Sequence, residues 1–154
     1  MEEIKQILNE YYPIKFDRIE MMRDMGSKSY TAFSGNNKYF LRVIKPVLFN
    51  TAVIGADIQV FLQNKGFPVP HIKLTNKQFP YVKNENILFI LYEFIEGSDS
   101  NPEQDAEAIG ALVGRLHQVM KKYPGELVKR DKHFYIGRYI EILQRKGYPR
   151  ISEY

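Results

Sequence analysis

The sequence predicts an α+β fold in which an antiparallel sheet comes first and helices follow. Before residue 97, short runs of β-branched, aromatic and alternating apolar residues are separated by turn residues, which is typical of strands. After residue 102, apolar residues recur at helical spacing instead. One helical stretch, 51–64, interrupts the strands and is expected to pack on the sheet. Such segregation of strands and helices favours α+β over alternating βαβ units.

The first elements are a helix and three strands. Apolar residues at helical spacing predict a helix over 2–12, which Pro13 ends. The strands expected next are 16–25, 29–34 and 38–44. The turn Gly35-Asn36-Asn37 is a good hairpin turn, because Gly and Asn tolerate positive φ. The second and third strands are therefore expected to be antiparallel neighbours.

In the middle of the chain, helix 51–64 is followed by further predicted strands of the same sheet. Gly66 is placed as the residue that ends helix 51–64, and the prolines of 67–70 force an extended segment. Three further runs are interpreted as strands, at 71–75, 79–84 and 87–94. These make six strand candidates in all, and we expect a sheet of about five strands.

The last third is predicted to be helical. A polar loop at 98–102 offers Asn101 as N-cap and Pro102 as first helical residue. A long helix over 103–121 is expected, with Ala108, Ala111, Leu112, Leu116 and Val119 facing inward. A final helix is expected over 133–145, with Asp131 as its N-cap. The change of composition near residues 97–102 marks the candidate domain boundary.

Composition excludes several classes of protein. The 154 residues contain no cysteine, which excludes disulfides, thiolate metal sites and a cysteine nucleophile. The acidic, amphipathic N-terminus is not a signal peptide, and no uninterrupted apolar run reaches the length of a membrane helix. The net charge of +4 comes from scattered lysines rather than a basic stripe. We expect a cytoplasmic protein that binds neither membrane nor nucleic acid.

Two short motifs could bind an anion. Gly26-Ser27-Lys28-Ser29 lies between two predicted strands, where amides and hydroxyls could hold phosphate oxygens, although an ordinary hairpin turn is the alternative. Arg42 lies on one strand face between Phe40 and Ile44. Its guanidinium could bind a phosphate in a bidentate manner, or the side chain could simply extend to solvent at the sheet rim. No histidine has the spacing of a metal ligand.

Four pieces in order resemble a known family. They are the Gly/Ser hairpin, "GFPVPHIKLTN" at 66–76, "LYEFIEG" at 91–97 and "LVGRLHQ" at 112–118. Together they resemble the N-terminal part of the aminoglycoside phosphotransferase and choline kinase-like family, in its spore-coat-kinase-like branch. The resemblance covers the whole chain but only about half of the family's pattern.

The resemblance implies a protein-kinase-like N-terminal lobe at 1–97, with a hinge at 92–97, followed at 98–154 by the first helices of a second lobe. The nucleotide, ATP or GTP, would lie against the hinge. The carbonyl of Glu93 would accept from an adenine amino group, the N–H of Ile95 would donate to a ring nitrogen, and Tyr92 would lie behind the base. The side chain of Glu93 would then be free to face solvent. The alternative for this stretch is an edge strand that ends at a glycine.

Phosphate-binding residues are implied in the same way. Arg42 matches the basic strand residue that contacts the phosphates, and Ser27 and Ser29 match the loop above them. The helix acid that would pair with Arg42 is in doubt, since Gly55 lies near its place and Asp57 is the nearest acid.

The family's catalytic segment, H-G-D-x-x-x-x-N, does not occur in these 154 residues, nor does its later magnesium-binding Asp. We therefore assign no catalytic or metal-binding residue, expect Mg²⁺ only in a complete enzyme, and expect this chain alone to be inactive. A small-molecule acceptor would be bound by a missing lobe. We expect the chain to be a fragment that self-associates through uncovered apolar helix faces. The alternative is a short non-catalytic protein that binds a nucleotide or a partner.

Overall fold

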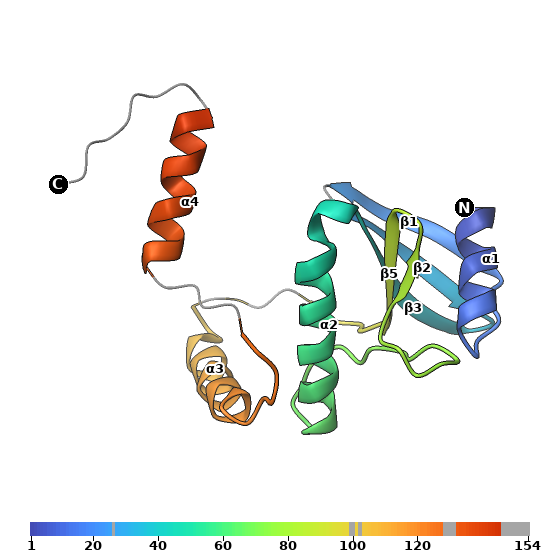
Figure 1. Ribbon diagram of the computed structural model, residues 1–154. Coiled ribbons are helices and arrows are strands. Elements are labelled where there is room, and N and C mark those ends of the chain that lie inside the picture. The colour runs from blue at the N-terminus through green and yellow to red at the C-terminus, as the bar shows by residue number, and fades with distance from the viewer. Residues whose placement is uncertain (26, 99–100, 102, 128–131, 146–154) are drawn as a thin grey trace. The chain divides into compact units, whose positions relative to one another are not determined.

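The computed structural model describes residues 1–25, 27–98, 101, 103–127 and 132–145, and it divides into two compact units, 1–123 (unit 1) and 124–154 (unit 2). Unit 1 holds a five-stranded antiparallel sheet and its helices, which confirms the predicted α+β class (Figure 1). The predicted domain boundary at residues 97–98 stays a prediction. The elements are α1 (Glu2–Tyr11), β1 (Arg18–Met25), β2 (Ser27–Ser34), β3 (Asn37–Ile44), the 3₁₀ turn η1 (Pro46–Leu48), α2 (Phe49–Asn64), β4 (Val82–Asn84), β5 (Ile87–Glu93), α3 (Ala106–Met120) and α4 (Lys132–Arg145).

The strands are ordered β1-β2-β3-β5-β4, and every neighbouring pair is antiparallel. The predicted hairpin between β2 and β3 is confirmed, since Ser34 pairs with Asn37 and only two residues connect them. Gly35 has φ 55°, which glycine adopts without strain. Its N–H donates to Asp17 Oδ2 at 2.6 Å, so the tip of the hairpin is fixed to the start of the sheet.

Each face of the sheet is covered by one helix, as Figure 1 shows. Residues on one face pack with α1, and residues on the other pack with α2, because successive side chains of a strand point to opposite faces. We call these the α1 face and the α2 face. The α1-face core contains Leu8, Tyr12, Phe16, Ile19, Tyr30, Ala32, Leu41, Val43, Val82, Phe89 and Leu91. The α2-face core contains Ile44, Ala56, Ile72, Leu88, Ile90 and Tyr92.

Helix α2 packs on the sheet as predicted, although it begins at Phe49 rather than residue 51. It ends in a Schellman motif: the Phe67 N–H donates to the Leu62 carbonyl, and the Gly66 N–H donates to the Gln63 carbonyl, both at 3.0 Å. Gly66 has φ 67°, so its predicted role as the residue that ends the helix is confirmed. By length and mean hydropathy alone, Pro46–Asn64 could cross a membrane, but Ala56 lies in the core on the sheet.

Two predicted strands differ in the structure: one is not formed, and the other is shorter. Residues 71–75 make one antiparallel bridge, Ile72 with Tyr92, instead of a strand. The run 79–84 forms strand only at β4, because Pro80 has no N–H for a ladder and the preceding residues form a turn in which Gln78 has φ 63°. The prediction of full strands in these two places was wrong.

The segment 71–76 nevertheless connects both faces around the edge of the sheet. The Ile72 N–H donates to Gln63 Oε1 of α2 at 3.0 Å. On the other side, Asn76 donates its backbone N–H to the Tyr11 carbonyl at 2.8 Å and its side-chain amide to the Glu10 carbonyl at 3.1 Å. The segment is thereby bonded both to α2 and to the end of α1.

Helix α3 differs from expectation in its start and in its burial. Asp105 occupies the N-cap position, whereas Asn101 Oδ1 accepts from the N–H groups of Glu103 and Gln104 and stabilises the turn before the helix. No residue of α3 is buried, so the expected inward face is not covered by the described residues. Pro102 and the predicted cap Asp131 lie outside the described residues.

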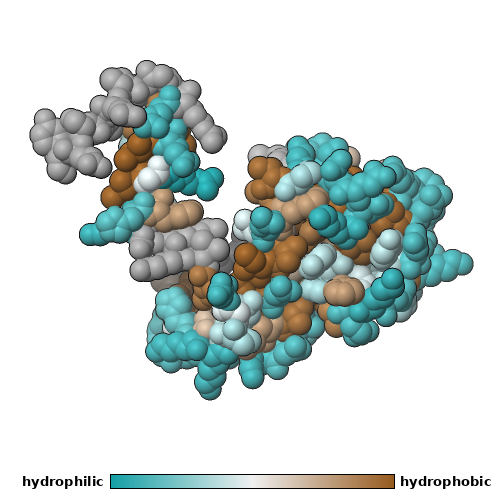
Figure 2. Space-filling view, in the orientation of Figure 1, coloured by the Kyte–Doolittle hydropathy of each residue, from teal (hydrophilic) through white to brown (hydrophobic). Residues whose placement is uncertain are grey.

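Exposed apolar side chains are frequent on the last two helices. Figure 2 shows apolar surface along α4, and the exposed large apolar residues there are Tyr135, Ile136, Tyr139, Ile140 and Ile142. On α3, Ile109, Leu112 and Val113 are also exposed. Within unit 1, the α3 region makes two ring contacts: Tyr123 meets Phe61 of α2 edge to face, and Arg115 of α3 lies over Phe67.

We expect Leu91→Ala to destabilise unit 1 strongly, because Leu91 is fully buried in the α1-face core. Loss of its side chain should lower the free energy of unfolding by about 2–5 kcal/mol in urea denaturation. Ile87→Ala on the same strand is the control, since Ile87 is 42% exposed and should cost much less. Equal losses for the two variants would contradict the burial of β5.

Candidate functional site

Arg42 is placed by the alternation of β3. It lies on the α2 face with Phe40 and Ile44, as predicted. Its cross-strand partners are Ser29 on β2 and Ile90 on β5. A charged side chain therefore interrupts the apolar row that Phe40 and Ile44 form along β3 in the middle of the sheet.

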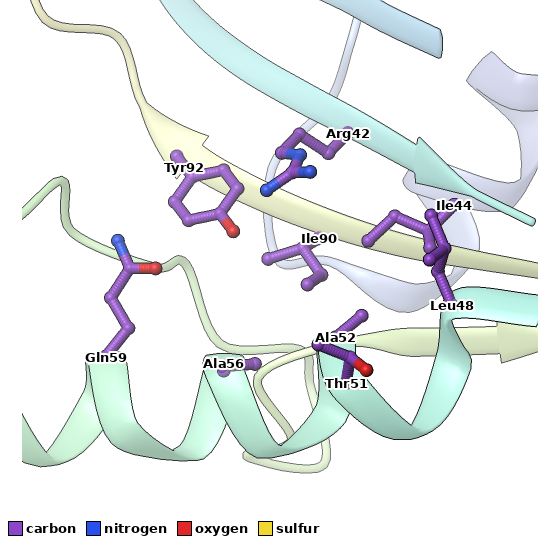
Figure 3. A pocket seen from close by; sticks show the side chains of 10 residues that line it. Arg42, Ile44, Leu48, Thr51, Ala52, Ala56, Gln59, Ile90 and Tyr92 are labelled. Atoms are coloured by element: carbon purple, nitrogen blue, oxygen red, sulfur yellow. The ribbon is translucent and has the colours of Figure 1, made fainter. Parts of the chain in front are cut away.

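A cavity of about 300 Å³ lies between this row and α2 (Figure 3). Its lining residues are Arg42, Ile44, Leu48, Thr51, Ala52, Gly55, Ala56, Gln59, Ile90 and Tyr92. Small residues on the sheet-facing side of α2 leave this space open. We call it the inner cavity.

Arg42 and Tyr92 lie side by side in the inner cavity. Figure 3 shows the guanidinium and the Tyr92 hydroxyl pointing toward one another. Burial raises the pKa of Tyr92, while the charge of Arg42 and the hydrogen bond from Arg42 oppose that rise. The Tyr92 hydroxyl is thus a neutral partner, and it leaves the positive charge of Arg42 uncompensated.

The carboxylate partner sought for Arg42 is not formed by Asp57. Asp57 does not line the inner cavity, and no ion pair among the described residues joins Arg42 to a carboxylate. Gly55 does line the cavity, with open space around the position of a Cβ. Among the described residues, Arg42 therefore has no carboxylate partner, and a helix acid for it stays unassigned.

A second cavity of about 200 Å³ adjoins the end of β5. It is lined by Met22, Phe40, Pro70, Tyr92, Glu93, Phe94 and Ile95. The structure thus brings together three predicted site residues, Tyr92, Glu93 and Ile95. We call this space the hinge cavity. Tyr92 lines both cavities and so stands between them.

Four residues of the hinge cavity were missed in the sequence. Phe40 could have been found from its place two residues before Arg42 on the same face. Met22 could not, because a register shift between Met21 and Arg23 inserts it into β1 as a bulge. Pro70 comes from an irregular segment with no periodicity to orient it. Phe94 was predicted as the last residue of a strand over 87–94, but it lies one residue beyond the end of β5.

The backbone at the end of β5 is only partly used within the protein. The Glu93 N–H donates to the His71 carbonyl at 2.8 Å. No backbone acceptor for the Ile95 N–H occurs among the described residues. The N–H of Ile95, a residue that lines the hinge cavity, is therefore not used by the backbone of the described residues.

The Glu93 side chain is not simply solvated, which corrects the expectation of a free carboxylate. It is 45% exposed, but it forms an ion pair with Lys73 and lies 3.5 Å from His71 Nδ1. The hydrogen bond from Lys73 lowers the pKa of Glu93, and the charges of Lys73 and His71 act in the same direction. The acidic residue that interrupts the apolar run thus links β5 to the edge segment 71–73.

Ser27 and Ser29 lie on β2, both half-buried. Ser29 is directly opposite Arg42, so the two share a face, and Ser27 is two residues further along that face. Gly26 lies outside the described residues. Among the described residues, no cluster of three or more His, Asp or Glu side chains could hold a metal ion.

Among known proteins, this chain is similar only to solved structures, and at low sequence identity. No family model matches the sequence, and no curated protein matches it. A spectinomycin phosphotransferase, APH(9)-Ia, crystallised with ADP and spectinomycin, matches 99% of this chain and 49% of its own, with TM-score 0.69 and 14% identity. A microcompartment-associated aminopropanol kinase matches 90% of this chain and 49% of its own, with TM-score 0.65 and 14% identity. An aminoglycoside phosphotransferase from Alicyclobacillus acidocaldarius matches 92% and 42%, with TM-score 0.60 and 16% identity.

The fold is that of aminoglycoside phosphotransferase-like kinases, and the sheet with its packed helix is their N-terminal lobe. The kinase-like fold inferred from the motifs is thereby confirmed. The chain spans about half the length of the solved structures that it matches.

We expect Glu93→Gln to lower stability at pH 7 and to have less effect in acid. Because the folded protein lowers the pKa of Glu93 below its ordinary 4.5, the ion pair stabilises above that pH and is lost as pH falls through the lowered pKa. The half-exposed pair should contribute less than about 1 kcal/mol in urea denaturation at pH 7.

Glu85→Gln is the matched control, since no ion pair of Glu85 occurs among the described residues. A loss for Glu93→Gln that persists unchanged at pH 3 would show that the ion pair is not its cause.

Proposed function

We propose that residues 1–97 bind the nucleotide of a small-molecule phosphotransferase, with 92–97 as the hinge to a second lobe that begins at 98. The purine would lie in the hinge cavity. There the carbonyl of Glu93 would accept from the base, and the N–H of Ile95 would donate to it. Phe40 and Tyr92 would supply an apolar, aromatic surface for the base, which is the usual character of such pockets.

The phosphates would extend from the hinge cavity past Tyr92 toward Arg42. Guanidinium groups bind phosphate oxygens in a bidentate manner, and Arg42 has no carboxylate partner among the described residues to compete for it. Ser29, its cross-strand neighbour, and Ser27 would add hydroxyl donors. The observation that carries the proposal is that Tyr92 joins an apolar cavity to one that contains an uncompensated cation.

The reaction of a complete enzyme would move the γ-phosphate of ATP or GTP to a hydroxyl of a small acceptor. Phosphoryl transfer depends on a positioned acid or base and on Mg²⁺. The 154 residues contain no H-G-D-x-x-x-x-N segment to supply them. We therefore propose that this chain alone binds nucleotide without transferring phosphate. The same absence keeps a non-catalytic nucleotide-binding protein as the second candidate function.

Titration calorimetry with ATP and adenosine tests this proposal. Both should bind, because the purine contacts do not need the phosphates, and Mg²⁺ should tighten ATP only weakly. Arg42→Ala should weaken ATP by roughly 1–3 kcal/mol and leave adenosine nearly unchanged.

Lys45→Ala is the control for charge, because Lys45 follows the same strand but lines a cavity on the α1 face. Absence of any nucleotide binding at millimolar concentration would refute the proposal. Equal losses for ATP and adenosine in Arg42→Ala would remove Arg42 as a phosphate ligand.

Self-association stays a prediction, supported by the exposed apolar residues of α3 and α4. A second copy that pairs these faces would remove them from water, and contiguous exposed apolar surface is uncommon on soluble monomers. Light scattering of the 154-residue chain should give a dimer or larger. Ile136→Glu on α4 should reduce the assembly, and a monomeric chain at high concentration would contradict the prediction.

A further inference from the structure

The bulge in β1 changes the face on which Arg23 lies. Met21 pairs with Tyr30, whose side chain belongs to the α1-face core. Regular alternation would put Arg23, two residues later, on that same face. Because Met22 is inserted as an extra residue, Arg23 instead pairs with Ser29 and shares the α2 face with it.

The next residue pair supports this assignment independently. Asp24 pairs with Lys28 in the register, and their side chains form an ion pair at 3.4 Å. Lys28 lines a cavity together with Tyr30 and Val43, both on the α1 face. Asp24 and Lys28 therefore lie on the α1 face, and Arg23 lies on the opposite one.

Arg23 and Arg42 consequently flank Ser29 in one cross-strand row. Arg23 is its partner on β1, and Arg42 is its partner on β3. Two strand spacings separate the arginine backbones by roughly 10 Å, a gap that two long side chains can close around one elongated anion.

No carboxylate neutralises this row among the described residues. Neither Arg23 nor Arg42 takes part in an ion pair there. Glu20, on the same face of β1, is already paired with Arg18. Two like charges held near each other without counter-charge favour an anion that carries several negative charges along its length.

We infer that Arg23 is a second phosphate-binding residue, and that Arg23 and Arg42 hold a linear polyphosphate chain between them across Ser29. The inference rests on the proposed function where it identifies this chain as the phosphates of a nucleoside triphosphate. Inorganic tripolyphosphate carries the same chemistry without the base. Arg23 then binds and orients the phosphates, and the bulge at Met22 places its side chain on the α2 face.

The test is titration calorimetry of the 154-residue chain with ATP, adenosine and inorganic tripolyphosphate. Arg23→Gln should weaken ATP and tripolyphosphate by about tenfold or more, as expected for a charge-assisted hydrogen bond, and should leave adenosine unchanged. Arg18→Gln is the matched control. It removes the same charge from the same face of β1, but from a residue that already pairs with Glu20, so it should change none of the three affinities.

The three ligands distinguish a failure of this inference from a failure of the proposed function. If ATP binds and Arg23→Gln behaves like Arg18→Gln, the inference is overturned while the proposed nucleotide site stands. If ATP and adenosine do not bind but tripolyphosphate binds and is lost in Arg23→Gln, the arginine pair stands without the nucleotide. If the chain binds none of the three ligands, both are overturned.

A deletion of Met22 provides a second, geometric test. Without Met22, Arg23 directly follows Met21 and stays opposite Ser29 on the α2 face, so the deletion should keep the affinity for tripolyphosphate, unlike Arg23→Gln. Circular dichroism establishes that the deleted chain is folded, and a folded deletion variant that loses tripolyphosphate affinity as Arg23→Gln does would overturn the assigned register, in which Met22 is the extra residue.

Discussion

The structure of unit 1 depends on the burial of β5 on both faces. Leu88, Phe89, Ile90 and Leu91 alternate between the two cores, and all are almost fully removed from water. A strand buried on both sides must satisfy its backbone groups on both edges, and β5 does so with β3 on one edge and with β4 and residues 71–73 on the other. The helices, the edge segment and both cavities are all positioned by contact with this one strand.

The same constraint explains why a site forms where β5 ends. Pairing on the outer edge stops at Glu93, whose N–H is taken by His71. Beyond that point the chain leaves the sheet, Ile95 lines the hinge cavity, and its N–H has no backbone acceptor among the described residues. Tyr92, the last buried residue, is 6% exposed and carries its hydroxyl to Arg42. The strand pairing of β5 thus ends at the same place where the hinge cavity meets the inner cavity that contains Arg42.

Much of this arrangement could be predicted from the sequence, because regular alternation has direct geometric consequences. The period of two along 38–44 was enough to place Arg42 on the face of Phe40 and Ile44. The glycines at 35 and 66 were recognisable because their positions require positive φ. What could not be predicted depends on irregularity: the bulge at Met22 leaves no periodic signal, and it decides the direction of Arg23. The pairing of Glu93 with Lys73 depends on a bridge between segments 20 residues apart, which local pattern does not encode.

The bonds between Asn76 and the end of α1 have a consequence for synthesis. Tyr11 and Glu10 find their partner 65 and 66 residues later in the chain, and the core under α1 also needs Phe89 and Leu91. During translation, the first helix leaves the ribosome long before any of these residues exists. An isolated ten-residue helix is marginal in water, so it gains a fixed place only when β5 has emerged. Helix α1 is thus made well before the residues on which it packs, and it is among the last elements of unit 1 that the nascent chain can anchor.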